Sequence, residues 1–576
     1  MDGRPTVITG LTPLRAVVTA VVVAAVVVLS ISRTIPFDSD EARHANLALK
    51  QYQDLRDLRF MDFLRHSYRT GEFPFFHGWT VVPVFALLGT TAFAARAAQC
   101  AHFVLGVAAT AYAGYRVCGD DRRAGGVAGA LFALSPALAT YSGLCMLETP
   151  GAAMTAVAIA CLAEALRADG RRGTLCDVFT AAAVLATWFT KLNYGIWILP
   201  AIAVGYVVPI GRHVDWRRAL RGLATYLGVV GVVLGAWYST ASQRAAFHGF
   251  LTNPAQAVSI VEDDPTFRLP AFSTDNFSAY FTLVPRDFHV HWILGAAVLL
   301  FFVVGTVRAL RDRSGAVAAA AACVGWTWLS LSMGFREYAL ARFIAPALPA
   351  VWIVAAYGAA PLLAKICERR WFRVVGGAAF AVALVVQLAT VRVRLAGPEP
   401  PEIAWLVPSA TDGPPPVEYE VDDRFRPVFT YLTETLASPA SVQVMNYTDH
   451  TSARTLEWEL GSAPGRRYSD FDVKTLIGER IYESDRAFDA WLDTPRSWGD
   501  ATWNSFIVEM VPGPGYLDAP QLVPATVQMW HDAILRRAPG RLQVVSSKTF
   551  EGLGLTVKVW RDLKPPPQVP AGASGN

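Results

Sequence analysis

An uninterrupted apolar run from about Leu14 to Ser32 constrains the fold of this chain more than any other feature of its sequence. About twenty apolar residues cross a bilayer as a helix, because a helix satisfies its own backbone hydrogen bonds. The run is longer than the apolar part of a signal peptide, has no small-x-small exit, and is followed by further apolar runs. We therefore expect a retained membrane span rather than a cleaved leader.

Further apolar runs bring the expected total to about eleven transmembrane helices. The later runs lie near 94–115, 124–142, 149–166, 175–190, 193–210, 219–239, 292–309, 315–333, 341–362 and 373–391. The segment Trp79–Leu88 is too short to span and predicts an interfacial or re-entrant helix. Only 17% of the residues are charged, against roughly a quarter in soluble domains. The sequence therefore predicts a polytopic α-helical membrane protein.

Basic residues collect in alternate loops between these runs, as they do on the cytoplasmic side of membrane proteins. They are Arg116, Arg122, Arg123, Arg167, Arg171, Arg172, Arg212, Arg217, Arg218, Arg221, Arg308, Arg311, Arg313, Lys365, Arg369, Arg370 and Arg373. This pattern predicts a cytoplasmic N-terminus, and the Ala, Val and Arg content is typical of a GC-rich bacterial genome. We expect a multi-pass protein of a bacterial inner membrane, and the net charge of +4 gives no indication of nucleic-acid binding.

The acidic turn after the first span is the first candidate for chemistry. Asp38 can serve as a helix N-cap, and Glu41 three residues later can complete a capping box. Asp40 has no such structural role, and His44 lies four residues further along the same helical face. We predict that Asp40 is functional; an exposed Asp–His pair on a helix is the alternative.

Other polar residues occur at span ends predicted to share the extracytoplasmic face. His77 could turn back towards Asp40, but Asp40, His44 and His77 have no diagnostic metal spacing, so a divalent metal ion stays open as a cofactor. Glu148 precedes Pro150 at a helix start, where the helix dipole alone favours an acid. Lys191, Arg336 and Arg342 break the positive-inside pattern, which either phosphate binding or snorkelling would explain.

In this order, these residues resemble the GT-C glycosyltransferases, especially the branch (glycosyltransferase family 39) of protein O-mannosyltransferases and lipid A aminoarabinose transferases. The resemblance covers about residues 10–390. Its motifs are Asp40-Glu41, Phe73–Phe76 with His77, Ser142…Glu148-x-Pro150, Lys191-Leu192-Asn193-Tyr194-Gly195 and Arg342-Phe343…Pro346…Pro349. Two motifs depart from the family pattern: His77-Gly78-Trp79-Thr80 replaces His-Pro-Pro-Leu, and Arg342-Phe343 replaces Arg-Tyr.

The resemblance implies a polyprenyl-phosphate-linked sugar as donor, Asp40 as a catalytic residue, and inversion at the anomeric carbon. Asp40 would act as general base on an acceptor hydroxyl. Lys191, Arg336 and Arg342 would neutralise the departing lipid phosphate. Glu148 would orient a substrate hydroxyl. Glu41 would do the same if its carboxylate is not used to cap the helix. His44 and His77 are further substrate-binding candidates. The sequence has no nucleotide-binding glycine motif, which fits a lipid-activated donor.

The outer segments complete the expected organisation. Residues 1–395 form the transmembrane catalytic domain, with interfacial helices in the outer loop 33–78 and a lid or acceptor-facing flap in the outer loop 240–291. Residues 396–416 are a Pro-rich linker, and 564–576 are disordered by composition. Residues 417–563 alternate strand-like and helical runs, which predicts a small cysteine-free extracytoplasmic α/β domain for acceptor binding or partner docking.

The leading hypothesis is therefore a membrane glycosyltransferase that moves a sugar from polyprenyl phosphate to an extracytoplasmic acceptor, either a cell-envelope lipid, a glycan or a protein. The alternatives are a transporter or flippase for lipid-linked glycans and a non-catalytic assembly factor. A transporter usually carries paired ionisable residues near the membrane midplane, whereas the spans here hold almost no charge. Membrane lipids are expected partners in each case.

Overall fold

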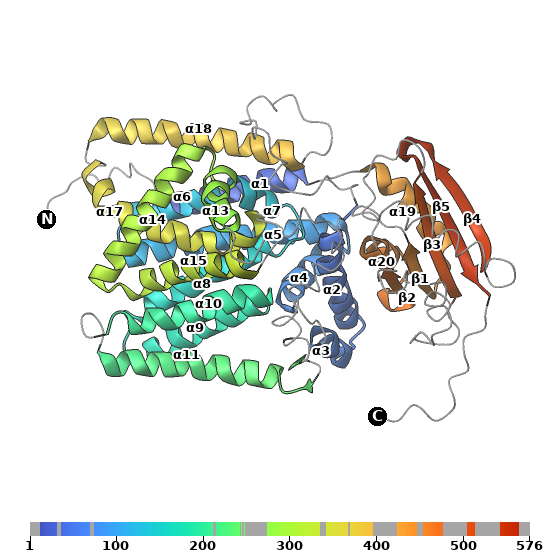
Figure 1. Cartoon of the computed structure of the whole chain (residues 1–576), viewed down its shortest axis with the longest axis horizontal. Coiled ribbons are helices and arrows are strands. Elements are labelled where there is room, and N and C mark those ends of the chain that lie inside the picture. Colours follow the sequence, from blue (N-terminus) through green and yellow to red (C-terminus); the bar gives the residue numbers. More distant parts are fainter. Residues whose placement is uncertain are drawn as a thin grey trace. The chain divides into compact units, whose positions relative to one another are not determined.

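The computed structural model describes residues 12–31, 36–37, 39–68, 74–210, 215–241, 243–244, 247, 274–334, 341–366, 369–395, 423–445, 453–475, 504–512 and 542–563. The chain forms two compact units (Figure 1). The bundle unit comprises Met1–Ser32, Leu64–Thr80 and Ala95–Glu420, and the sheet unit comprises Arg33–Phe63, Val81–Ala94 and Val421–Asn576. The sheet unit thus includes two segments that precede most of the bundle in sequence.

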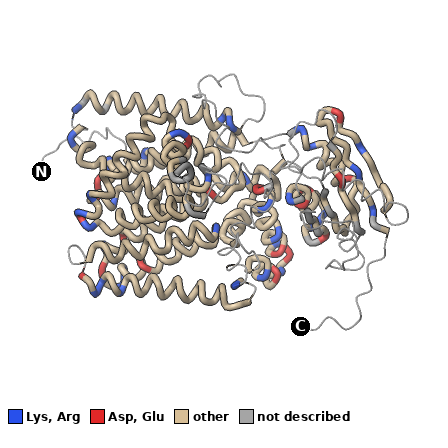
Figure 2. The backbone as a smooth tube through the Cα atoms, viewed as in Figure 1, with Lys and Arg blue, Asp and Glu red and all other residues tan. Residues whose placement is uncertain are grey.

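The bundle unit is built from long helices with little charge along their length. They are α1 (Pro13–Ser30), α5 (Ala92–Val117), α6 (Arg122–Ala133), α7 (Pro136–Tyr141), α8 (Glu148–Ala165), α9 (Gly170–Trp188), α10 (Leu192–Val207), α11 (Trp216–Trp237), α13 (Thr274–Asp287), α14 (Trp292–Asp312), α15 (Gly315–Gly334), α16 (Ala341–Ile344), η3 (Ala345–Ala347), α17 (Leu348–Ile366) and α18 (Arg370–Leu395). Figure 2 shows that charged residues of this unit gather near the helix ends.

Within the described chain, seven helical stretches are long and apolar enough to cross a membrane. They are Pro13–Ser30, Ala92–Val117, Trp216–Trp237, Trp292–Asp312, Gly315–Ser332, Arg342–Ile366 and Val374–Leu395. Each of the other predicted spans also coincides with helix. The run 124–142 is divided between α6 and α7, because Pro136 has no backbone N–H with which to continue a helix. The predicted polytopic α-helical protein is confirmed.

Helices α14 and α17 cross at glycines and approach each other unusually closely. A Cβ built at Gly305 would fall on the backbone oxygen of Val354, and one at Gly358 on the backbone oxygen of Phe301. The Gly358 Cβ would also lie 2.7 Å from the backbone nitrogen of Gly305. Small residues let membrane helices pack by dispersion where no hydrophobic driving force acts between them. This crossing therefore requires glycine, which has no side chain, at positions 305 and 358.

We expect Gly358→Ala to destabilise the bundle, because the added methyl group has only backbone atoms to displace. Overpacking of this kind costs about 1–3 kcal/mol. Gly325→Ala in α15 is the matched control, because a Cβ there meets no atom within 4 Å. Thermal unfolding in detergent should show a lower midpoint for Gly358→Ala alone. An unchanged midpoint for Gly358→Ala would contradict this account of the crossing.

The sheet unit contains one mixed sheet with strand order β2-β1-β3-β5-β4. The strands are β1 (Ala440–Met445), β2 (Phe471–Thr475), β3 (Asn504–Pro512), β4 (Leu542–Phe550) and β5 (Leu555–Asp562). Strand β1 runs parallel to β2 and β3, while β5 runs antiparallel to β3 and β4. Apolar residues of α19 (Arg426–Thr435), α20 (Ala453–Ser462) and the strands form its core. The predicted small C-terminal α/β domain is confirmed.

Some details of the fold differ from the sequence reading. Strand β2 was not expected, because Phe471–Thr475 is short and contains Asp472 and Lys474. Helix α13 occupies the end of the expected loop 240–291. Most of that loop, the linker 396–416 and the end 564–576 lie outside the described residues. So do two of the runs with a helical pattern in the C-terminal domain, 487–492 and 526–537.

The remaining helices come from the first outer segment. They are α2 (Ser39–Arg56), α3 (Phe60–Tyr68) and α4 (Phe76–Leu88). Helix α2 belongs to the sheet unit, and the boundary between the units passes through α3 and α4. Helix α4 is an apolar helix of 13 residues, shorter than a span, as predicted for the segment Trp79–Leu88.

Candidate functional site

Several predicted site residues meet where helices α8 and α10 begin in the bundle unit. Glu148 is the first residue of α8 and is 2% exposed, and Lys191 is the N-cap of α10. Tyr194 lies in the first turn of α10 and packs so tightly on α8 that a Cβ at Gly151 would approach its ring within 2.6 Å. We call Glu148, Lys191, Tyr194, Arg342 and Phe343 the Glu148 cluster.

Aromatic rings hold the two cations of the Glu148 cluster. Lys191 Nζ lies 5.4 Å from the ring centroid of Tyr194 and 5.6 Å from that of Phe343. The guanidinium carbon of Arg342 lies 5.3 Å from the Phe343 centroid. Glu148 and Arg342 both act electrostatically on the Tyr194 hydroxyl. One end of the bundle therefore combines a buried carboxyl group, a phenol and two cations.

Two buried oxygens near this end have no hydrogen-bond partner among the residues that the structure describes. They are Glu148 Oε2 and Asn193 Oδ1, and the buried Tyr194 hydroxyl interacts with the Glu148 carboxyl group. A buried polar atom without a partner costs free energy, so such atoms are rare in folded proteins. Their presence together beside two cations is typical of a site that binds a polar, anionic ligand.

The other acidic candidates lie on α2 in the sheet unit. The Asp40 side chain is 38% exposed, and its Oδ1 lies 3.9 Å from Nη1 of Arg454. Glu41 and His44 are buried on the same helix. Asp38, the expected N-cap, lies outside the described residues, as does Arg336. Among the candidate carboxyl groups of Asp40, Glu41 and Glu148, that of Asp40 is the accessible one.

His77 is buried in the bundle unit against helix α5. Its Nε2 lies 2.8 Å from the Gln99 side-chain nitrogen, so this amide donates to the imidazole. His102, one turn further along α5, acts electrostatically on the same ring. In the described part of the chain, no three His, Cys, Asp or Glu residues are arranged to hold a metal ion. The His77 imidazole thus interacts with polar side chains of α5.

Tyr194 and Asn193 were part of a sequence motif, but no role was predicted for them. Their spacing after Lys191 places them in the first turn of the same helix, which is the signal that could have identified them. Arg394 was not considered either. It ends α18, interacts electrostatically with Asp287 and Tyr141, and has a buried Nη1 without a partner among described residues. Arg394 departs from the positive-inside pattern, and this departure could have identified it as a candidate from the sequence.

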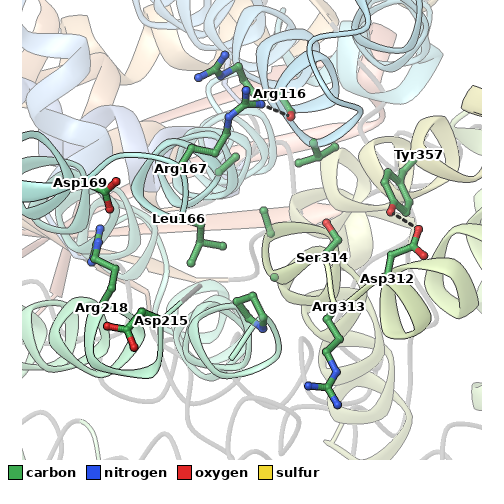
Figure 3. Close-up of a pocket in the computed structure, with 15 residues that line it drawn as sticks. Arg116, Leu166, Arg167, Asp169, Asp215, Arg218, Asp312, Arg313, Ser314 and Tyr357 are labelled. Atoms are coloured by element: carbon green, nitrogen blue, oxygen red, sulfur yellow. Dashed lines mark hydrogen bonds between the residues drawn. The ribbon is translucent and has the colours of Figure 1, made fainter. Parts of the chain in front are cut away.

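A second polar region lies at the other end of α8, about 27 Å from Glu148 along the helix. Figure 3 shows this cavity, of about 760 Å³. Its charged and polar lining includes Arg116, Arg167, Asp169, Asp215, Arg218, Asp312, Arg313, Ser314 and Tyr357. These residues come from the predicted cytoplasmic loops and the adjoining helix ends.

Ion pairs within the bundle neutralise three of the four arginines that line this cavity. Arg218 Nη1 donates to Asp177 Oδ2 at 3.0 Å, and the Tyr206 hydroxyl donates to Asp177 Oδ1 at 2.9 Å. Arg167 forms two hydrogen bonds with Asp120, at 3.1 and 2.9 Å. The Arg116 guanidinium pairs with Glu164 and Asp120. These pairs join residues from the ends of different helices, which indicates a structural clamp between the helices.

Removing Asp177 should destabilise the bundle, because it would leave the Arg218 guanidinium, 14% exposed, without its buried counterion. Breaking a buried pair from one side costs about 3–5 kcal/mol. We therefore expect Asp177→Ala to lower the thermal unfolding midpoint in detergent. Arg172→Ala is the control, since Arg172 is 77% exposed and its pair with Glu164 is long, at 3.5 Å. Equal midpoints for the two variants would refute the clamp.

The helix bundle with its attached mixed sheet has the GT-C fold. The chain is similar to ArnT from Cupriavidus metallidurans, both in the apo state and bound to undecaprenyl phosphate. The sequence identities are 16% and 17%, and both comparisons have a TM-score of 0.54 and cover 94% of this chain and 97% of the other. The resemblance predicted from the motifs is confirmed at the level of the fold.

A third similar structure is the archaeal oligosaccharyltransferase AglB from Archaeoglobus fulgidus, in complex with an inhibitory peptide and a dolichol-phosphate. It is 13% identical, with a TM-score of 0.49, over 79% of this chain and 65% of AglB. The sequence itself matches no protein-family profile and no curated protein. The similarity is therefore one of three-dimensional structure.

Proposed function

We propose that this protein is a membrane glycosyltransferase that moves a sugar from a polyprenyl phosphate to an extracytoplasmic acceptor. The observation that carries the proposal is the Glu148 cluster, where Lys191 and Arg342 lie beside buried polar atoms that lack partners. A phosphate-linked sugar supplies what such a site accepts: an anion for the cations and hydroxyl groups for the polar atoms. ArnT, which shares the fold, has been crystallised with undecaprenyl phosphate.

The proposed orientation places the Glu148 cluster on the extracytoplasmic side. The arginine-rich cavity lies at the opposite end of α8 and contains loop residues that the positive-inside rule assigns to the cytoplasm. Outside the cytoplasm a sugar must arrive already activated, and a polyprenyl phosphate carries it in the membrane. The acceptor is a component of the cell envelope.

The proposed reaction is a single displacement. The acceptor oxygen forms a bond to the anomeric carbon, and the bond from that carbon to the phosphate oxygen breaks. The acceptor proton passes to the Asp40 carboxylate, which acts as general base. The phosphodiester becomes a phosphomonoester and gains negative charge, which Lys191 and Arg342 stabilise. Glu148 and Tyr194 bind sugar hydroxyls.

Asp40→Asn should abolish most turnover, because the amide cannot accept the proton. A general base contributes about 10²–10⁴-fold to the rate. Release of undecaprenyl phosphate from synthetic undecaprenyl-phosphate sugars, mannosyl and aminoarabinosyl donors first, measures turnover with envelope membranes as the acceptor source. Asp62→Asn on α3 is the control for loss of a carboxylate. Full turnover by Asp40→Asn would refute the assignment of the base.

Lys191→Ala and Arg342→Ala should each weaken binding of undecaprenyl phosphate about tenfold or more, since a hydrogen bond to a charged group contributes about 1.5–3 kcal/mol. Lys365→Ala is the control, because Lys365 lies in the last turn of α17, at its far end from Arg342. Native mass spectrometry of the purified variants with added undecaprenyl phosphate gives the affinities. Unchanged affinity in both variants would remove the Glu148 cluster from donor binding.

A further inference from the structure

Helix α2 carries Asp40 and packs on the C-terminal domain, which we define as residues 423–563. Its contacts there are as extensive as those of an element of the domain itself. The Asn46 side-chain amide donates to the backbone oxygen of Arg454 at 2.9 Å and to Glu457 Oε2 at 3.1 Å. Further along α2, Gln53 Nε2 donates to the backbone oxygen of Gly461 at 3.2 Å. The backbone N–H of Tyr468 donates to Gln53 Oε1 at 2.8 Å.

Aromatic contacts add to this interface before α2 and in its second half. Before the helix, the Phe37 ring packs edge-on against Trp458, with centroids 4.8 Å apart, and Thr455 Oγ1 donates to the Phe37 backbone oxygen at 3.1 Å. Near the other end, Lys50 Nζ lies 4.1 Å from the Tyr468 ring centroid. The interface therefore runs from Phe37 to Gln53, and Asp40 lies at its exposed border, 3.9 Å from Arg454.

The side-chain amides of Asn46 and Gln53, which connect α2 to the C-terminal domain, allow only one position of the helix. Asn46 and Gln53 are both buried, and each bonds to backbone groups of the C-terminal domain. If α2 turned or slid, these groups would lose their partners, which is costly for buried polar atoms. The helix therefore has one register on the domain.

We propose that the C-terminal domain positions the Asp40 carboxylate for catalysis, with Gln53, Asn46 and Arg454 as positioning residues. The proposal rests on the function proposed above and assigns the domain a part in the reaction itself. Arg454 contributes directly, because its guanidinium lies 3.9 Å from Asp40 Oδ1. Gln53 and Asn46 contribute through the placement of the helix.

Gln53→Ala separates positioning from substrate contact. Gln53 lies 13 residues from Asp40, about 20 Å along the helix, so its loss removes only the attachment of α2. We expect kcat, measured as release of undecaprenyl phosphate from the donor sugar, to fall at least tenfold. The affinity for undecaprenyl phosphate should be unchanged, because the Glu148 cluster belongs to the bundle unit. Arg56→Ala, at the exposed end of α2, is the control and should keep the wild-type kcat.

Arg454→Ala provides a second variant in which folding is not at risk, since the Arg454 side chain is 41% exposed. We expect a two- to fivefold loss of kcat, as suits an exposed pair worth about 1 kcal/mol or less, with recovery in Arg454→Lys. In the Asp40→Asn background, Arg454→Ala and Gln53→Ala should have no further effect on the residual rate, because both act through Asp40.

The outcomes distinguish this inference from the proposed function. Wild-type kcat in both Gln53→Ala and Arg454→Ala, with an inactive Asp40→Asn, overturns the positioning role and leaves the enzyme assignment standing. Active Asp40→Asn overturns the function on which the inference rests. Loss of undecaprenyl phosphate affinity in Gln53→Ala, together with full kcat in Arg454→Ala, also overturns positioning, since the first effect is then general damage to the fold.

Discussion

The hydrocarbon interior of a bilayer tolerates almost no unpaired polar groups, and the rest of this structure depends on that constraint. The bundle unit can therefore carry charge mainly at the ends of its helices. The charged and polar groups at the two ends of α8 differ in how they are paired. At the Arg218 end, carboxylates within the bundle neutralise Arg116, Arg167 and Arg218. At the Glu148 end, polar atoms are buried without partners among the described residues. The first arrangement stabilises the fold, and the second fits a ligand.

The chemistry proposed for the chain draws on both compact units. Lys191, Arg342 and Glu148 belong to the bundle unit, which suits the binding of a lipid phosphate because the lipid resides in the membrane. Asp40 belongs to the sheet unit, together with the five strands. Donor binding and proton removal are thus assigned by the proposal to residues of different compact units of one chain.

Much of this organisation could be predicted from sequence, because its signals are local. Apolar runs of the right length predicted the helices, and Pro136 marks the break between α6 and α7. The positive-inside pattern identified Lys191 and Arg342 as unusual, and the structure brings them together around Phe343. The membership of α2 in the sheet unit could not be predicted. Its contacts join residues more than 400 positions apart, such as Asn46 and Arg454, and side-chain packing of that range leaves no periodicity in the sequence.

The interlocking of α2 with α20 also determines how the chain can be divided. A C-terminal domain expressed by itself would expose the apolar surface that Phe37 covers on Trp458. It would also leave the backbone N–H of Tyr468 without the oxygen of Gln53. Exchange of this domain between related proteins would mismatch the same surface unless the segments Arg33–Phe63 and Val81–Ala94 were transferred with it. The unit that can be exchanged is therefore discontinuous in sequence and consists of three segments.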